Sequence, residues 1–246
     1  MIALTLFLSL HLRSQFGPCQ TQRCYGNSCD CNQWSNWEQR TIMMHYPDFP
    51  ECSLMVTYCY RQCVDPANDT AHTCVEIYIQ NIQAVAPYCG DCSRFIQWLE
   101  EGNDIQKGRK ARGVFIFFFR YIVFTDWYDF ISDIEPEDYP YCDMPGEVRK
   151  KYHYRTAACI GYCKTQYPVG MPNVRLLIEP YECENQACCL RKIELCIDRV
   201  TGQTMSWETL QTIPTTYCED VFVPIEVCKP GTNVTATKCK HNCTED

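Results

Sequence analysis

Two stretches of the chain decide the fold class: SLMVTYCYRQ at residues 53–62 and TCVEIYIQNIQAV at residues 73–85. Apolar and polar residues alternate in both, and a period of two residues is typical of a β-strand with one face in a core. The residues between them include Asp65, Pro66 and Asn68, which favour a turn or loop. The two stretches are therefore predicted to form an antiparallel hairpin with a long loop.

Two similar runs follow at residues 148–157 (VRKKYHYRTA) and 173–180 (NVRLLIEP), and they are predicted to form a second hairpin. The first strands of the two pairs share a Tyr-x-Tyr-Arg segment, at residues 58–61 and 152–155. We interpret this likeness as a degenerate internal duplication that gives two similar halves. The alternative is a chance match between segments that both have good strand composition.

A third hairpin is the clearest of the three. Residues 191–200 and 203–210 flank Thr201 and Gly202, and a Thr-Gly pair between strand-like runs is a tight-turn signature. The tail from residue 224 is polar and holds three cysteines, so we expect cross-links to order it.

The middle of the chain lacks this alternation and is predicted to be helical. Residues 93–101 read as a short helix that ends at Gly102, and no Gly or Pro occurs at residues 114–135. One face of the second helix would carry Val114, Phe117, Phe118, Tyr121, Thr125, Tyr128 and Ile131. We expect this face to lie in the core, and a contact surface for another protein is the alternative. The candidate contact aromatics are Phe117, Phe118, Tyr121 and Trp127.

These patterns predict a β-rich α+β fold, with disulfide-stapled antiparallel hairpins in two similar halves and a helical insertion. The predicted divisions are a signal peptide at 1–15, a Cys-rich start with the first β half at 16–91, the insertion at 92–132, the second β half at 133–223 and a Cys-rich tail at 224–246.

Cysteine accounts for 21 of the 246 residues, near the share at which composition itself indicates a disulfide scaffold. Cytosolic reductants keep thiols reduced, so this content predicts an exported protein that folds in an oxidising compartment. A multi-zinc protein is the alternative, but the histidines lack zinc-finger spacing. The odd number predicts that at least one cysteine stays free or bonds another chain.

The N-terminus fits export. Residues 2–10 are an apolar run of signal-peptide length with polar residues after them, so cleavage is expected near residue 15. A buried N-terminal strand or helix is the alternative. The apolar run at residues 114–124 contains Arg120 and is too short to span a membrane. We therefore expect a secreted, extracellular or cell-surface protein, with the periplasm as the alternative location.

The formal net charge of −8 and the lack of a long basic run exclude nucleic acid as the main partner. The acidic stretch at residues 133–138 is interrupted by Pro136 and fits a solvated loop better than a paired acid and base. The sequence predicts no metal site and no cofactor, and a weak calcium site at this acidic stretch is the alternative.

Residues 89–92 (CGDC) form a Cys-x-x-Cys motif after a strand-like run and before a predicted helix. This arrangement resembles thioredoxin-like oxidoreductases, in which a helix N-terminus lowers the pKa of the leading cysteine. The chain departs from that pattern, because Tyr88 stands at the tryptophan position, Asp91 disfavours a thiolate and no βαβ frame surrounds the motif. A thiol-disulfide oxidoreductase that uses Cys89 and Cys92 is kept as an alternative function.

Residues 34–37 (WSNW) resemble the W-x-x-W opening of thrombospondin type 1 repeats. In that family tryptophans stack with arginines in a Cys-bridged, three-stranded sliver, and Arg61 and Cys63 match the later R-x-C part. The C-S-x-T-C-G stretch of the family is absent. The alternative is two amphipathic indoles that lie on a small sheet.

The layout as a whole consists of early cysteines, the WSNW segment, a Tyr-x-Tyr-Arg-x-Cys strand, a helical middle and a hairpin that contains Cys188 and Cys189. It resembles uncharacterised Cys-rich secreted proteins of Bacteroidetes bacteria. The resemblance implies an exported, cell-surface or extracellular protein and carries over no catalytic residues.

Cys188 and Cys189 are adjacent, and adjacent cysteines rarely bond each other because of the strained ring, so each is predicted to reach a different partner at a disulfide junction. Asn-x-Ser/Thr sequons at Asn68, Asn233 and Asn242 lie in polar stretches and are candidate glycosylation sites.

The sequence lacks a recognisable catalytic constellation and is rich in cysteines and aromatics, which favours a non-enzymatic role. We predict an exported structural or assembly subunit, or a surface binding module, whose partner is a protein: a second copy or another surface protein. Besides the oxidoreductase, a secreted inhibitor or toxin-like effector is the other alternative.

Overall fold

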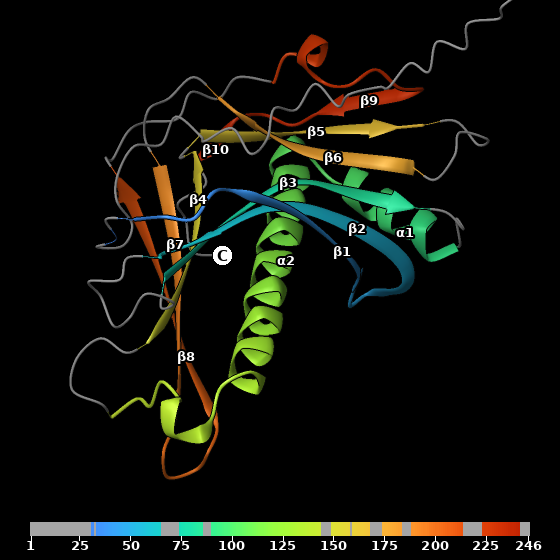
Figure 1. The fold of residues 1–246 in the computed structure, drawn as a ribbon. Helices are drawn as coiled ribbons and strands as arrows, with labels where there is room; N and C mark the ends of the chain where they lie inside the picture. The colour runs from blue at the N-terminus through green and yellow to red at the C-terminus, as the bar shows by residue number, and fades with distance from the viewer. Residues whose placement is uncertain are drawn as a thin grey trace, which may run out of the picture.

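The computed structural model describes residues 31, 33–64, 74–85, 90–143, 149–157, 159–167, 174–183, 188–213 and 223–241. In chain order its elements are β1 (Glu38–Tyr46), β2 (Phe49–Gln62), β3 (Cys74–Val85), α1 (Gly90–Glu100), α2 (Asp104–Ser132), η1 (Pro136–Asp138), β4 (Lys150–Ala157), β5 (Cys159–Gln166), β6 (Val174–Glu182), β7 (Cys188–Ile197), β8 (Thr204–Ile213), η2 (Ile225–Val227), β9 (Asn233–Ala236) and β10 (Lys240–His241). The strands form one mixed ten-stranded sheet, and α2 runs along its inner side (Figure 1). This confirms the predicted β-rich α+β class.

The sheet forks at β3. One edge of β3 pairs with β2 along most of its length. The opposite edge is shared: residues 74–77 pair with β4 in parallel, and residues 82–85 pair with β6 antiparallel. One branch continues as β4, β7 and β8, and the other as β6 and β5 with β9 and β10. Figure 1 shows the first branch beside α2 and the second across its N-terminal end.

Two of the three predicted hairpins are confirmed. β2 and β3 pair antiparallel, with Leu54 opposite Ala84 and Gln62 opposite Val75. β7 and β8 pair over their whole length, and the turn between them places Gly202 at a φ of 68°. Glycine adopts a positive φ at little cost in conformational energy, and this explains why the Thr-Gly pair predicted the turn correctly.

The second predicted hairpin is wrong in its pairing. β4 pairs with β3 and β7, whereas β6 pairs with β5 and β3. The cause is β5, which lies between them in the chain and is buried at nearly every position. A strand buried on both faces has no alternation to reveal it. The two Tyr-x-Tyr-Arg segments flank β3, since Tyr60 and Tyr154 both pair with Ile77. The duplication itself stays a prediction.

The predicted helical insertion is present as α1 and α2. Asn103 caps α2: its Oδ1 accepts a hydrogen bond from the Gln106 backbone N–H at 3.0 Å, and the Gln106 Oε1 accepts from the Asn103 N–H at 2.9 Å. The Lys110 Nζ donates to the Trp98 carbonyl at 2.6 Å, which satisfies a carbonyl at the end of α1.

The predicted core face of α2 needs correction. The side chains that pack on the sheet form the inner face of α2, which consists of Phe115, Phe118, Phe119, Ile122, Val123 and Trp127, all buried. Tyr121 and Tyr128, which were expected beside Phe118 in the core, are exposed. Apolar residues surround this helix almost completely, so a 3.6-residue period does not identify the face that the sheet covers.

Disulfides cross-link the fold at Cys31–Cys63, Cys52–Cys92, Cys142–Cys196, Cys163–Cys228 and Cys183–Cys239. Every cysteine whose side chain the structure describes takes part in a disulfide. The loops that these bonds close are 32 to 65 residues long, and closing one loop of that size stabilises the fold by about 4 kcal/mol in the chain-entropy account. Within the described ranges, no helix is long and apolar enough to cross a membrane.

Candidate functional site

A row of aromatic and apolar side chains lies on the side of α2 opposite its inner face. We define the outer face of α2 as Phe117, Tyr121, Phe124, Tyr128 and Ile131. Spacings of four and three residues place these side chains in one row along the helix. Tyr121 is 47% exposed and Tyr128 is 56% exposed, while the other three are half-buried against the core. The row is therefore a partly apolar surface that is open at Tyr121 and Tyr128.

The sheet explains why the row is open. Edge strand β1 crosses α2 near Phe117, where Tyr46 contacts Phe117 and Phe118 with ring centroids 5.1 and 6.4 Å apart. Beyond this crossing the C-terminal half of α2 extends past β1, with β8 beside it and Tyr60 of β2 reaching Asp126 (Figure 1). The inner face stays covered there, because the Trp127 Nε1 donates to the Thr204 Oγ1 at 3.0 Å.

A buried polar network fixes this half of α2 to β4. The Asp126 Oδ2 accepts hydrogen bonds from the Tyr152 hydroxyl at 2.8 Å and from the Lys150 Nζ at 3.0 Å. Burial lowers the pKa of Lys150, although the Asp126 carboxylate acts against this shift. Burial, reinforced by Asp126, raises the pKa of Tyr152. The network holds the outer face on a rigid base, because a satisfied buried network orients the element that carries it.

A second polar contact anchors α2 to β8. The Glu208 carboxylate accepts hydrogen bonds from the Arg120 Nε at 2.8 Å and Nη2 at 3.1 Å, and it also pairs with Arg191. Partial burial acts to raise the pKa of Glu208, but these two guanidinium groups lower it overall. Arg120 lies at the border of the outer face, and its charge is balanced within the chain.

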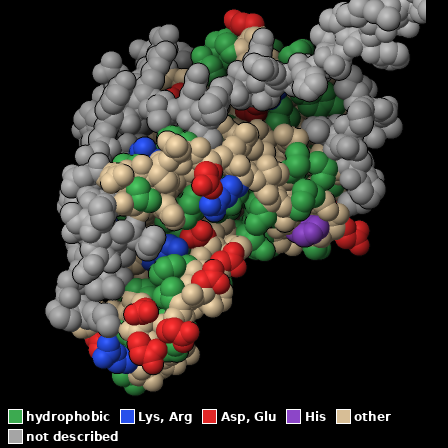
Figure 2. All heavy atoms as spheres, in the orientation of Figure 1, with side chains coloured by type: hydrophobic (Ala, Val, Ile, Leu, Met, Phe, Trp, Pro, Cys, Tyr) green, Lys and Arg blue, Asp and Glu red, His purple; other side chains and the backbone are tan. Residues whose placement is uncertain are grey.

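Carboxylates cluster at the C-terminal end of α2 and in η1, next along the chain. Between Arg120 and Arg149 the sequence contains no further Lys or Arg. We define the acidic rim as the exposed side chains Asp129, Asp133, Glu135, Glu137 and Asp138. Figure 2 shows acidic side chains over this end of α2 and over η1. None of the five forms an ion pair with a residue that the structure describes.

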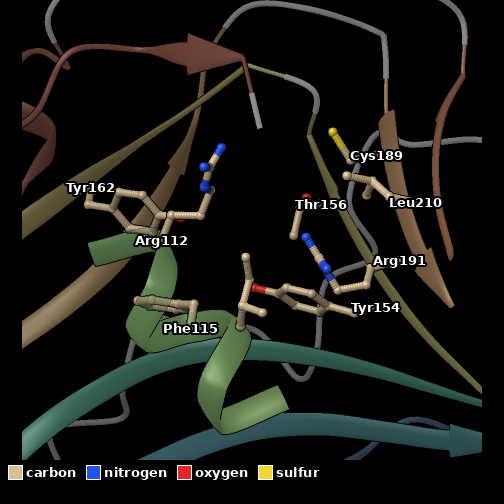
Figure 3. A pocket seen from close by; sticks show the side chains of 9 residues that line it. Arg112, Phe115, Tyr154, Thr156, Tyr162, Cys189, Arg191 and Leu210 are labelled. Atoms are coloured by element: carbon tan, nitrogen blue, oxygen red, sulfur yellow. The ribbon is translucent and has the colours of Figure 1, made fainter. Parts of the chain in front are cut away.

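A small cavity lies between α2, β4, β5 and β7. Figure 3 shows Arg112 from α2 and Arg191 from β7 directed toward one space, with Thr156 between them. The cavity measures about 10 Å³, which is room for about one water molecule. Its size excludes it as a pocket for an organic substrate in this conformation.

An open hollow of about 420 Å³ lies at the junction of the two helices, lined by Glu101, Gly102, Gln106, Arg109 and Lys110. Three of its lining residues already have partners within the chain: Glu101, Gln106 and Lys110. Lys110 satisfies the last carbonyls of α1, and Gln106 closes the capping box of α2. We therefore assign the hollow to the surface of the junction between α1 and α2 and not to a binding site.

The stacking that the thrombospondin resemblance implies is present at the start of the described chain. The Arg61 guanidinium lies 4.5 Å from the ring centroid of Trp34 and 4.6 Å from that of Trp37. Its Nε donates to Glu76 at 2.6 Å, and the neighbouring Cys63 bonds Cys31. These contacts tie the WSNW segment to β2 and β3, so we assign them to the scaffold.

The structure describes one cysteine of the Cys-x-x-Cys motif, Cys92. Cys92 lies in α1, is fully buried and forms a disulfide with Cys52 of β2. Cys89 lies outside the described residues. Cys189 is buried and disulfide-bonded, and the backbone of Cys188 begins β7. Because Cys92 is buried and already bonded to Cys52, it is not available to form a redox pair with Cys89. The structure therefore does not support the oxidoreductase alternative.

The remaining predicted site residues fall into three groups. Asn233 is exposed at the start of β9, whereas Asn68 and Asn242 lie outside the described residues. Phe118 and Trp127 are fully buried, so they contact the sheet and not another protein. Tyr121 is exposed as a contact aromatic would be.

Sequence reasoning did not identify Phe124 as part of an exposed row, and it placed Tyr128 in the core. The spacing of Phe117, Tyr121, Phe124, Tyr128 and Ile131 was a usable signal, because the residues that are most exposed in the row are tyrosines. No sequence pattern predicts the contacts of Asp126 with Lys150 and Tyr152, because Asp126 lies in α2 and its two partners lie in β4.

The chain matches no protein-family model, no curated protein and no solved structure. The resemblance to Cys-rich secreted proteins of Bacteroidetes stays a prediction.

Proposed function

We propose that this protein is an exported, non-enzymatic binding subunit that contacts another protein through the outer face of α2. The observation that carries the proposal is the exposure of Tyr121 and Tyr128, in a row with three half-buried apolar side chains, on a helix whose other side forms the core. Such contiguous apolar rows on a rigid element are typical of protein interfaces.

Tyrosine suits this role for a physical reason. Its ring gives a large contact area at a small cost in side-chain entropy, and its hydroxyl stays hydrated until a partner arrives. Tyrosines are also over-represented among the residues that dominate binding energy. The disulfides support the export part of the proposal, because such cross-links persist in oxidising compartments.

Site-specific photo-crosslinking tests the proposal. A photoreactive phenylalanine analogue replaces Tyr128 in one sample and Ile225 in another, because Ile225 is 57% exposed and lies in η2, which contacts β9 on the other branch of the sheet. We expect a discrete crosslinked protein species, or a crosslinked dimer, from position 128 alone. Its yield should fall when Tyr121→Ser is added.

Equal crosslinking from both positions, or insensitivity to Tyr121→Ser, would contradict the proposal. A non-reducing gel with thiol blocking, run on the same samples, shows whether the odd cysteine forms a covalent link between chains.

A further inference from the structure

We propose that the outer face of α2 and the acidic rim together bind a basic, amphipathic segment of a partner protein, an inference that rests on the proposed function. The apolar row supplies contact area, and the rim determines which sign of charge the partner must carry. The occupant is thus defined by two complementary properties: apolar side chains against the row and Lys or Arg side chains against the rim.

The chain neutralises most of the charges around this half of α2 by itself. The cations near this half of α2 already have carboxylate partners: Lys150 has Asp126, Arg120 has Glu208 and Arg199 has Asp143. None of the five rim carboxylates forms an ion pair within the described residues, and the Lys150 ammonium acts on Asp129 only at longer range. A local negative field therefore remains at the end of the row, and a positive segment is attracted to it.

The same charges disfavour a second copy of the chain at this surface. A two-fold pairing of outer faces brings the two copies of Asp129 and Asp133 into one interface, where like charges repel. No Lys or Arg between residues 120 and 149 offsets them. A nucleic acid or an acidic protein meets the same repulsion. A basic segment is the occupant that gains from both the row and the rim.

The dimensions fit a short segment. The row from Phe117 to Ile131 is about 21 Å long at the rise of an α-helix. A partner helix of about four turns covers that length, and an apolar face laid along an exposed row is a common mode of peptide recognition. The base of the row does not need to rearrange, because Asp126, Tyr152 and Trp127 are already fixed by hydrogen bonds.

The test uses three synthetic amphipathic peptides of about 18 residues, each with a Leu/Phe face and with Lys, Glu or Gln on the other face. Binding to the intact protein is measured by fluorescence anisotropy at about 0.02 M and about 0.5 M salt. We expect the Lys peptide to bind most tightly at low salt and to lose most of this advantage at high salt.

Two variants separate the row from the rim. Tyr121→Ser with Tyr128→Ser should weaken binding of the Lys peptide by about tenfold or more. Asp129→Asn with Asp133→Asn should weaken it by about threefold at low salt only. The charge-matched control is Glu101→Gln with Glu226→Gln, since both carboxylates are exposed, one after α1 and the other in η2, away from the C-terminal half of α2. This control should bind like the unmodified protein.

The outcomes distinguish the two proposals. Equal binding of the Lys, Glu and Gln peptides, all weakened by the tyrosine changes, would overturn the charge assignment and leave the outer face as a binding surface. Unchanged binding in the tyrosine variant would refute the outer face itself. Sedimentation of the protein alone gives the third outcome: a dimer lost on Tyr121→Ser with Tyr128→Ser makes a second copy the occupant and overturns the inference.

Discussion

The inner and outer faces of α2 are built from similar residues on one helix, yet they meet opposite environments. The inner face presents Phe118, Phe119 and Trp127 to the sheet, and all three are fully buried. The outer face presents Tyr121 and Tyr128, which are about half exposed. The two faces differ at the tips of the rings. The exposed rings carry a hydroxyl that water can solvate, whereas the buried indole N–H of Trp127 needs Thr204 as a partner. A polar tip therefore distinguishes the faces better than total apolar content.

Truncation of the inner face should have the largest effect on stability. We expect Phe118→Ala to lower the free energy of unfolding by about 3–5 kcal/mol, because it opens a cavity that the packed helix and sheet cannot fill. Chemical denaturation with the disulfides intact measures this change. A loss below about 1 kcal/mol would mean that the inner face is not a packed core.

The attachment of α2 to β4 should be the next most sensitive point. Asp126→Ala leaves the Lys150 ammonium buried beside Tyr152 without its carboxylate, so we expect a loss of about 3 kcal/mol. Adding Lys150→Met removes the stranded charge and should recover part of that loss. If the double variant is less stable than Asp126→Ala alone, Lys150 has a stabilising role apart from Asp126.

The Glu208 contact should give a smaller, pH-dependent effect. Its pKa is lowered in the folded protein, so the contribution of Glu208 is present above its unfolded pKa and is lost as the pH falls through the folded value. We expect Glu208→Gln to cost about 1 kcal/mol at pH 7 and progressively less below about pH 4. Thermal unfolding of both proteins across pH tests this, and a difference that does not change with pH would contradict it.

The outer face should give the smallest stability change. Tyr128→Ser is expected to alter the free energy of unfolding by less than about 0.5 kcal/mol, because the side chain is more than half exposed. The same denaturation assay compares it directly with Phe118→Ala. A cost near that of Phe118→Ala would show that the two faces are both core and would remove the basis for a binding surface.

Sequence patterns recovered the parts of the fold whose signal is local. Alternation predicted the pairing of β2 with β3, and Thr201 with Gly202 predicted the β7–β8 turn. β5 was not predicted, because a strand that is buried on both faces shows no alternation of apolar and polar residues. The buried face of α2 was predicted incorrectly, because apolar residues surround the helix. Only the arrangement of the sheet decides which of them are covered.

The candidate site was predictable to a similar degree. Tyr121 was identified as a contact aromatic, but Trp127 was grouped with it although its ring is buried. The Asp126–Lys150 pair joins residues 24 positions apart on different elements, and no periodicity connects them. The disulfide of Cys92 with Cys52, 40 residues away, was likewise beyond sequence reasoning.

The fork at β3 makes the two branches of the sheet one cooperative unit. β3 shares its backbone hydrogen bonds with β2, β4 and β6, so neither branch separates without exposing an edge of the strand that both need. Domains whose parts share a central strand unfold together and not piece by piece. A partner that binds α2 would therefore protect the whole sheet, including strands that it never touches.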